Sequence, residues 1–184
     1  MIDLKPPCHR MIELVAGVDD AQLSSATACA GYSLGDLIDH VDLVAEGFAA
    51  LALGKPGEAP DREPAAANLG AGWRDGVVEH LRALGTAWDD PAAWQGSTET
   101  AGVELANEVW GKIVLTELVV HGWDIAKAVG RPADMPEEAV RHCYEHVAVF
   151  VPNAPVPSLW GPAVDVPADA PLLDRVVGIT GRTP

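Results

Sequence analysis

Apolar side chains recur every three or four residues along most of this chain, which is the spacing that places them on one face of an α-helix. This rhythm predicts a first helix over residues 4–17 and a second over residues 34–53. Ser33 stands directly before the second helix and Asp36 follows three residues later, close to the capping-box pattern that begins helices. Both segments are therefore expected to present an apolar stripe to a shared core.

The same rhythm predicts four further helices, over about residues 65–88, 107–130, 136–150 and 171–177. The third helix is expected despite four glycines that lower its helix propensity, namely Gly70, Gly72, Gly76 and Gly85. Gly130 is expected to end the fourth helix in a left-handed conformation. Residues 89–103 are expected to form a loop with room for a small hairpin.

These elements indicate an all-α protein, a four-helix bundle with an additional C-terminal helix and loops. The connections over residues 54–64 and 152–168 are rich in proline, so they are expected to be linkers without regular structure. Because the connections between the second and third helices and between the third and fourth helices are long, the topology need not be a simple up-down-up-down bundle. A chain of 184 residues without internal repeats is expected to form a single domain spanning residues 1–184.

The charge balance excludes several classes of partner. Acidic residues number 27 against 12 basic ones, giving a formal net charge of −15. Contacts to nucleic-acid phosphates and to anionic membranes rely on Lys and Arg, so neither partner is expected. The chain has no apolar run of membrane-spanning length and no apolar signal core near its start, so a cytoplasmic location is expected. Three cysteines without C-x-x-C spacing are expected to be reduced, namely Cys8, Cys29 and Cys143.

The expected helix over residues 107–130 carries an acid and an imidazole inside an otherwise apolar run. Glu117 and His121 are four residues apart, so they lie on the same helical face. Burying unpaired polar groups is costly, and a shared metal ion is one way to satisfy both. An ordinary ion pair within the helix is the alternative. His40, at the edge of the apolar stripe of the second helix, can also reach inward.

Three sequence motifs resemble the DinB/YfiT-like metalloenzyme superfamily, and more closely the metal-binding domain of mycothiol-dependent maleylpyruvate isomerases and their stand-alone actinobacterial relatives. The motifs are TACAGYSLGDLIDHV at 27–41, ELVVHGWDIAKAVG at 117–130 and the G-R-x-P ending of the chain. Ala28 and Tyr32 stand where the family usually has proline and tryptophan. The isomerase has a further C-terminal domain that helps to form its substrate site, so the resemblance is not carried over to maleylpyruvate itself.

The resemblance implies that His40, Glu117 and His121 are the ligands of a divalent metal, zinc or alternatively nickel. It also implies a four-helix bundle, mycothiol as a possible cosubstrate and a homodimer. Two imidazoles and a carboxylate suit such metals, and three protein ligands leave a coordination position open, as catalytic sites do. Asp124, three residues after His121, is expected to accept a hydrogen bond from an imidazole N–H.

The leading hypothesis is thus a metal-dependent enzyme of the thiol-dependent transferase or isomerase kind, acting on a small electrophile. A non-catalytic metal- or ligand-binding bundle is the main alternative, and a purely structural bundle is a third. Trp110 and Trp123 are expected to fill the core rather than wall a pocket. His142 and His146 are also four residues apart, but their charged neighbours predict a solvated helix face.

Overall fold

The computed structural model describes residues 1–58, 60–100, 102–154 and 160–184. Within these residues it contains six α-helices and one small hairpin. The helices are α1 (Lys5–Ala16), α2 (Leu34–Ala52), α3 (Trp73–Ala87), α4 (Asn107–Ala128), α5 (Glu137–Phe150) and α6 (Leu172–Ile179). The hairpin pairs β1 (Ser97–Thr100) with β2 (Val103–Ala106) in antiparallel register.

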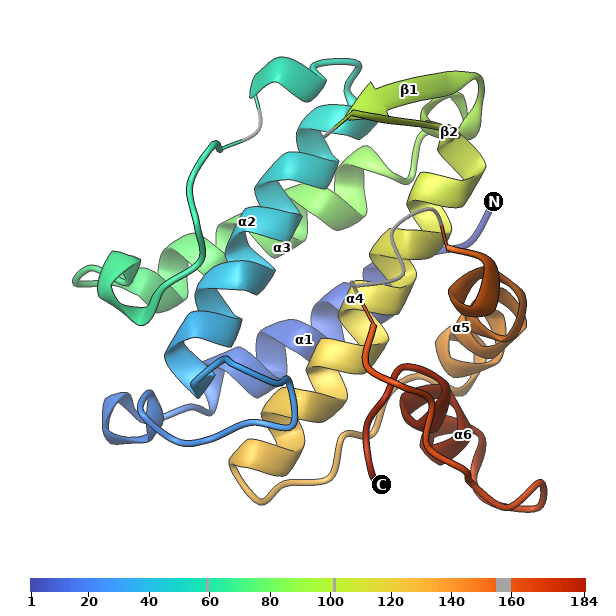
Figure 1. Ribbon diagram of the computed structural model, residues 1–184. Coiled ribbons are helices and arrows are strands. Elements are labelled where there is room, and N and C mark those ends of the chain that lie inside the picture. The colour runs from blue at the N-terminus through green and yellow to red at the C-terminus, as the bar shows by residue number, and fades with distance from the viewer. Residues whose placement is uncertain (59, 101, 155–159) are drawn as a thin grey trace.

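Helices α1 to α4 form a four-helix bundle (Figure 1). Helix α2 packs against α3 and α4, and α1 packs against the same two helices from the other side. Helix α5 lies on the outside of α4, and α6 packs on α5 (Figure 1). The predicted all-α bundle with an additional C-terminal part is therefore confirmed. No helix among the described residues is long and apolar enough to cross a membrane.

The start of α2 follows from its sequence. The Ser33 backbone N–H donates to Asp36 Oδ2 at 2.9 Å, and the Asp36 N–H donates back to Ser33 Oγ at 3.3 Å. These two bonds satisfy backbone donors that a helix N-terminus leaves without intrahelical partners. The capping box predicted from the sequence is confirmed. The left-handed Gly130 just beyond α4, with φ of 69°, is confirmed as well.

The predicted start of the third helix is wrong by about eight residues. Residues 66–68 form only a short 3₁₀ turn, and α3 begins at Trp73. Gly72 immediately before it has φ of 80°, a left-handed conformation that interrupts any right-handed helix. The apolar rhythm therefore continues through a segment whose glycines break the backbone regularity. Leu69 still packs against the core from outside the helix.

The connecting segments are partly regular. The expected hairpin is present and extends to Ala106, three residues further than expected. Short 3₁₀ turns occupy Pro56–Glu58, Pro91–Trp94 and Val151–Asn153. Parts of both predicted linkers, residue 59 and residues 155–159, lie outside the described residues, as does residue 101.

Close helix packing around α4 depends on glycine at one position. A Cβ atom at Gly111 would lie 2.5 Å from Trp94 Cζ3 and 2.8 Å from Trp88 Cζ3. The two indole rings pack edge to face with centroids 5.0 Å apart. They occupy the space that a side chain at Gly111 would need, so this part of α4 is fixed against the neighbouring segments.

Candidate metal centre

Three polar side chains meet between α2 and α4. His40 Nε2 lies 3.1 Å from Glu117 Oε2, and His121 Nε2 lies 3.0 Å from the same oxygen. The two imidazole rings are arranged edge to face, with centroids 4.9 Å apart. His40, Glu117 and His121 thus converge as the family resemblance implies, with one possible ligand atom from each within 4.8 Å of the others.

The position of Glu117 and His121 follows from helical spacing, since residues four apart on α4 stack on one face. His40 comes from α2, and its place is fixed by the preceding residue. Asp39 is buried, and its Oδ2 accepts hydrogen bonds from Arg62 Nη1 at 2.5 Å, Asn68 Nδ2 at 2.8 Å and the Ala65 backbone N–H at 2.9 Å. These bonds tie the segment before α3 to α2 beside His40, which restrains the helix turn that presents the imidazole.

The imidazoles and carboxylates of the cluster each favour the charged form of the other. Burial alone would raise the pKa of Glu117, but the adjacent His121 and His40 outweigh it and hold that pKa well below its usual range. Burial would likewise lower the pKa of His121, but the carboxylates of Glu117 and Asp124 raise it to about 9. Without a metal, the two carboxylates thus favour the protonated form of His121, and a metal at Nε2 would take the place of that proton.

Asp124 supports His121 from the side away from Glu117. His121 Nδ1 lies 3.0 Å from Asp124 Oδ2, and because an ionised carboxylate only accepts, Nδ1–H is the donor. Asp124 is fully buried, and Arg182 from the C-terminal tail donates to it through Nη2 at 3.0 Å and Nε at 3.3 Å. The hydrogen bond expected between Asp124 and an imidazole N–H is present, and it leaves Nε2 of His121 to face the cluster. A role for Asp124 beside a bound metal stays a prediction.

Sequence reasoning missed two neighbours of this cluster. Arg182 belongs to the G-R-x-P ending that supported the resemblance, but its contact with Asp124 spans 58 residues and has no local signal. Cys29 lies in the TACAG motif and was expected only to be a reduced thiol. Its sulfur lies within 4.8 Å of a ring nitrogen of His121 and a carboxylate oxygen of Asp124, and the side chain is half-buried. Burial raises the pKa of the Cys29 thiol, although Arg182 opposes this effect.

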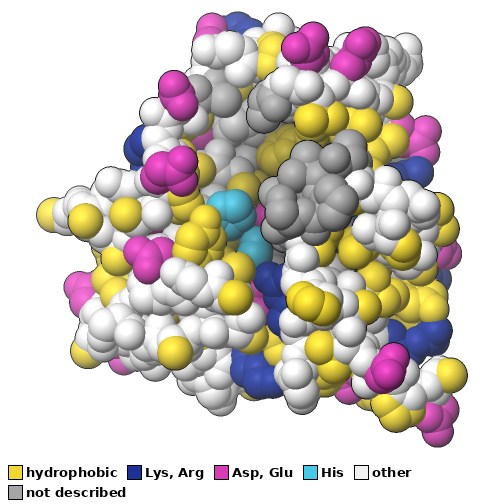
Figure 2. Space-filling model, in the orientation of Figure 1, with side chains coloured by type: hydrophobic (Ala, Val, Ile, Leu, Met, Phe, Trp, Pro, Cys, Tyr) yellow, Lys and Arg dark blue, Asp and Glu magenta, His cyan; other side chains and the backbone are white. Residues whose placement is uncertain are grey.

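The donor set fits a divalent metal of the zinc type. Two imidazole nitrogens and one carboxylate oxygen are ligands that zinc and nickel accept. An acceptor for the second ring nitrogen of a ligating histidine is the usual companion of such sites, and Asp124 supplies it for His121. The His40 side chain is 26% exposed and that of Glu117 is 18% exposed, so the cluster is reached from solvent on one side. Figure 2 shows histidine side chains at the surface of a hollow on this face.

The other histidines behave differently from the cluster. The prediction that His142 and His146 lie on a solvated face is wrong for His146, which is buried against α4, whereas His142 lies beside Glu138 and Glu145.

His80 is held between two carboxylates of α2, with Nδ1 2.7 Å from Asp42 and Nε2 3.5 Å from Glu46. Because its two nitrogens face different carboxylates, His80 is arranged as an ion-pair partner.

The two tryptophans of α4 are buried, as predicted. Trp110 joins the hydrophobic core and donates from Nε1 to the Thr98 carbonyl at 2.9 Å. Trp123 is 8% exposed and lies under the Lys127 ammonium, 4.5 Å from the ring centroid. Lys127 in turn donates to the Thr183 carbonyl at 2.7 Å. Trp123 therefore helps to seat the C-terminal tail next to Arg182.

Solved structures share this architecture. The chain superposes on the crystal structure of the mycothiol-dependent maleylpyruvate isomerase with a TM-score of 0.60 and 20% sequence identity, covering 78% of this chain and 66% of that chain. A structure of a mutant of that isomerase gives a TM-score of 0.57 with 18% identity over the same shares. The present chain thus spans about two thirds of the isomerase, and the similarity establishes the fold.

Sequence comparison extends over more of the chain. Uncharacterized proteins from two strains of Mycobacterium tuberculosis are 30% identical over 177 residues, which is 92% of this chain and 90% of each relative. Residues 4–126 match the family described as the mycothiol maleylpyruvate isomerase N-terminal domain. This match contains α1 to α3, all of α4 except its last two residues, and all three converging residues. The chain therefore belongs to the mycothiol maleylpyruvate isomerase N-terminal domain family.

Proposed function

We propose that this protein is a divalent-metal-dependent enzyme that uses a low-molecular-weight thiol of the mycothiol type to modify a small electrophile. The observation that carries the proposal is the convergence of His40, Glu117 and His121 at a partly exposed position between α2 and α4. These residues would hold the metal, with zinc the first candidate. Three protein ligands leave a position for an exchangeable group, as catalytic zinc sites do, whereas structural zinc sites are closed by four ligands.

When bound, the metal would supply Lewis acidity and lower the pKa of a thiol or water beside it. The residues of this chain orient the candidate metal ligands and keep water away from the buried side of the cluster. Asp124 fixes the ring of His121, and Arg182 fixes Asp124. The thiol would lose its proton to solvent, and its sulfur would form a bond to the electrophilic carbon. In a transfer reaction, formation of the C–S bond displaces a leaving group, which departs with its electron pair. In an isomerisation, formation of the C–S bond breaks a C=C π bond whose electron pair moves onto a conjugated carbonyl; after rotation about the resulting single bond, that pair returns, re-forms the double bond and expels the thiolate.

Metal content tests the first half of the proposal. Freshly purified wild-type protein is expected to contain about one divalent metal per chain, measured by mass spectrometry of the elements, or to take up one equivalent of zinc. His121→Ala is expected to lose it, because two remaining ligands hold zinc poorly. His142→Ala removes a histidine outside the cluster and should retain the metal. Wild-type protein that neither contains nor takes up metal, with the same result for His121→Ala, would refute the metal site.

Turnover tests the second half of the proposal, which is catalysis with a thiol. The zinc-loaded protein is incubated with mycothiol and a small panel of electrophiles, such as monochlorobimane and an α,β-unsaturated ketone, and adduct formation is followed above the uncatalysed rate. Catalysis is expected to disappear on treatment with a chelator and to return with zinc. A protein that binds zinc tightly but accelerates none of these reactions would be the non-catalytic binding bundle instead.

A further inference from the structure

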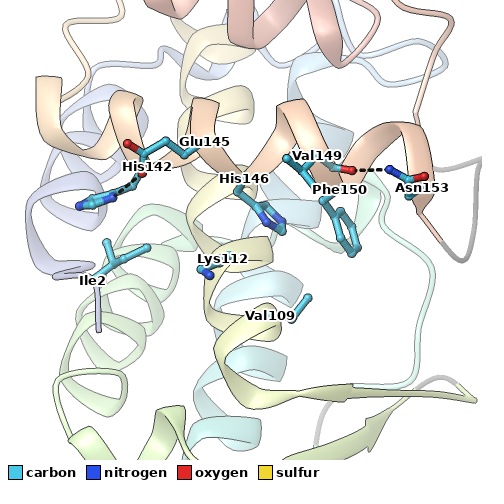
Figure 3. Close-up of a pocket in the computed structure, with 9 residues that line it drawn as sticks. All are labelled: Ile2, Val109, Lys112, His142, Glu145, His146, Val149, Phe150 and Asn153. Atoms are coloured by element: carbon cyan, nitrogen blue, oxygen red, sulfur yellow. Dashed lines mark hydrogen bonds and ion pairs between the residues drawn. The ribbon is translucent and has the colours of Figure 1, made fainter.

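A cavity lies on the other side of α4 from the candidate metal centre, between α4, α5 and the N-terminal residues. It has a volume of about 610 Å³, which is within the range of small-molecule sites. Its apolar walls come from Ile2, Val109, Val149 and Phe150, and its polar groups include Lys112 and His146 (Figure 3). Lys112 and His121 are nine residues apart, which is about two and a half helical turns, so this cavity and the candidate metal centre are on opposite faces of α4.

His146 is the unusual residue of this cavity. It is 9% exposed, yet its Nε2 atom has no hydrogen-bond partner among the described residues. Buried polar atoms in native proteins nearly always have a partner, so an unpaired one needs an explanation. The ring projects from α5 toward α4 and stacks on Phe150, with centroids 4.7 Å apart and planes inclined by 22° (Figure 3). The imidazole is therefore held in place while one of its nitrogens is unused.

The electrostatics around His146 favour an anionic group. Burial and the nearby Lys112 charge lower the pKa of His146 to about 4, so the ring is neutral at pH 7 and can donate one N–H. Lys112 Nζ lies 2.6 Å from Glu108 Oε1, and this pair is partly exposed, so the ammonium retains donors for a second acceptor. Glu145 at the rim is paired with Arg141 at 3.2 Å and with His142 at 3.3 Å. Arg141 also contacts Glu138 at 3.3 Å, so it offsets the negative charge of Glu145 only in part.

We propose that this cavity binds a small carboxylic acid with an aromatic or branched apolar body. The carboxylate lies between His146 Nε2 and Lys112 Nζ, and the apolar body packs against Phe150, Val109 and Val149. Such a ligand would satisfy the unpaired nitrogen and cover apolar wall that is otherwise exposed, since Val149 is 69% exposed. The site is separate from the proposed metal chemistry and does not depend on it.

The test is a titration of the isotope-labelled full chain with benzoate, followed by amide chemical shifts. Benzamide, which has the same shape without the charge, is the matched ligand. Benzoate is expected to shift amides of residues 109–112 and 146–150 in a saturable way, and benzamide to bind about tenfold more weakly or worse, because hydrogen bonds to charged groups are the stronger ones. Chelator treatment should leave the benzoate result unchanged.

Variants of the lining residues distinguish benzoate binding in this cavity from nonspecific benzoate binding at the protein surface. Lys112→Met and His146→Leu are each expected to weaken benzoate binding about tenfold or more. Lys55→Met is the matched control, because Lys55 also pairs with a nearby glutamate, 3.3 Å away, but lies far from the cavity in sequence and outside its lining. Melting temperature is measured for every variant, and His146→Leu is expected to melt no lower than wild type, because the unpaired polar atom is removed.

Several results would overturn the proposal. They include no shift of the lining residues with benzoate, equal binding of benzamide, and unchanged binding by the two cavity variants while both remain folded. Shifts confined to the surroundings of His40 and His121 would assign benzoate to the metal centre instead. Concentration-dependent broadening of the cavity amides with a doubled molecular mass would assign this face to a second copy of the chain.

Discussion

Arg182 and Asp124 form a buried ion pair that joins the C-terminal tail to the helix that carries two of the three candidate ligands. Arg182 is 8% exposed, Asp124 is fully buried, and both Nη2 and Nε of the guanidinium contact the carboxylate. Arg182 Nη1 also donates to the Thr180 carbonyl at 2.8 Å. A planar guanidinium can satisfy this set of acceptors at once, which a lysine ammonium cannot reproduce in the same geometry.

Arg182→Met is expected to weaken zinc binding by about 10- to 100-fold, the usual consequence of losing support for a ligating histidine. The physical reason is that Asp124, without its partner, no longer fixes the His121 ring. Competition with a chromophoric chelator measures the affinity. Arg141→Met removes an exposed arginine of α5 and serves as the control. An unchanged zinc affinity in folded Arg182→Met would show that the tail supports the fold and not the site.

Zinc is expected to stabilise the wild-type protein. At a free concentration about 100-fold above the dissociation constant, a ligand of the native state adds about 2.7 kcal/mol to the free energy of unfolding. For a chain of this size that corresponds to a rise in melting temperature of about 5–10 °C. Differential scanning fluorimetry with zinc and with a chelator measures it. Glu117→Gln should lose most of the rise, and an identical rise in this variant would place the zinc elsewhere.

Gly111→Ala is expected to destabilise the protein by about 1–3 kcal/mol, because the new methyl group would overlap the rings of Trp94 and Trp88. Gly76→Ala is the matched change within α3, where a Cβ atom meets no other atom within 4 Å. It should stabilise the protein by up to about 1 kcal/mol, since alanine is the better helix former. Urea denaturation measures both. If the two variants shifted stability in the same direction, the close packing at Gly111 would be wrong.

His146 predicts a specific pH dependence of stability. Its pKa is lowered from 6.5 to about 4 in the folded state, so the unfolded chain binds a proton that the folded protein does not between these values. Stability should therefore be complete above pH 6.5 and fall as the pH drops toward 4, by about 3 kcal/mol. The facing groups are Lys112 from α4 and His142 and Glu145 from α5, with apolar Ile2 from the N-terminal residues.

The measurement is urea unfolding at a series of pH values for wild type and His146→Leu. The leucine variant should lose less stability over this window, and the difference between the two curves isolates His146. His9→Leu is the control, because the His9 side chain is 75% exposed. Parallel curves for wild type and His146→Leu would mean that the ring titrates normally in the folded protein.

Much of the bundle is determined locally, which is why the sequence predicts it. The apolar rhythm identifies all six helices, and the Ser33–Asp36 box and Gly130 mark helix ends through hydrogen bonds and conformations that span only a few residues. Glu117 and His121 meet because four residues make about one helical turn. The same rhythm misplaces the start of α3, because periodicity reports side-chain burial and not the left-handed backbone at Gly72.

Tertiary structure alone decides which distant residues meet. His40 reaches Glu117 across 77 residues of sequence, a meeting that only the family resemblance suggested. Neither composition nor spacing indicates that Arg182 holds Asp124, or that Cys29 lies beside His121. His146 has the charged neighbours of a solvated residue, yet the packing of α5 on α4 buries it. Sequence patterns specify faces of helices, whereas the packing of those helices determines which face becomes a site.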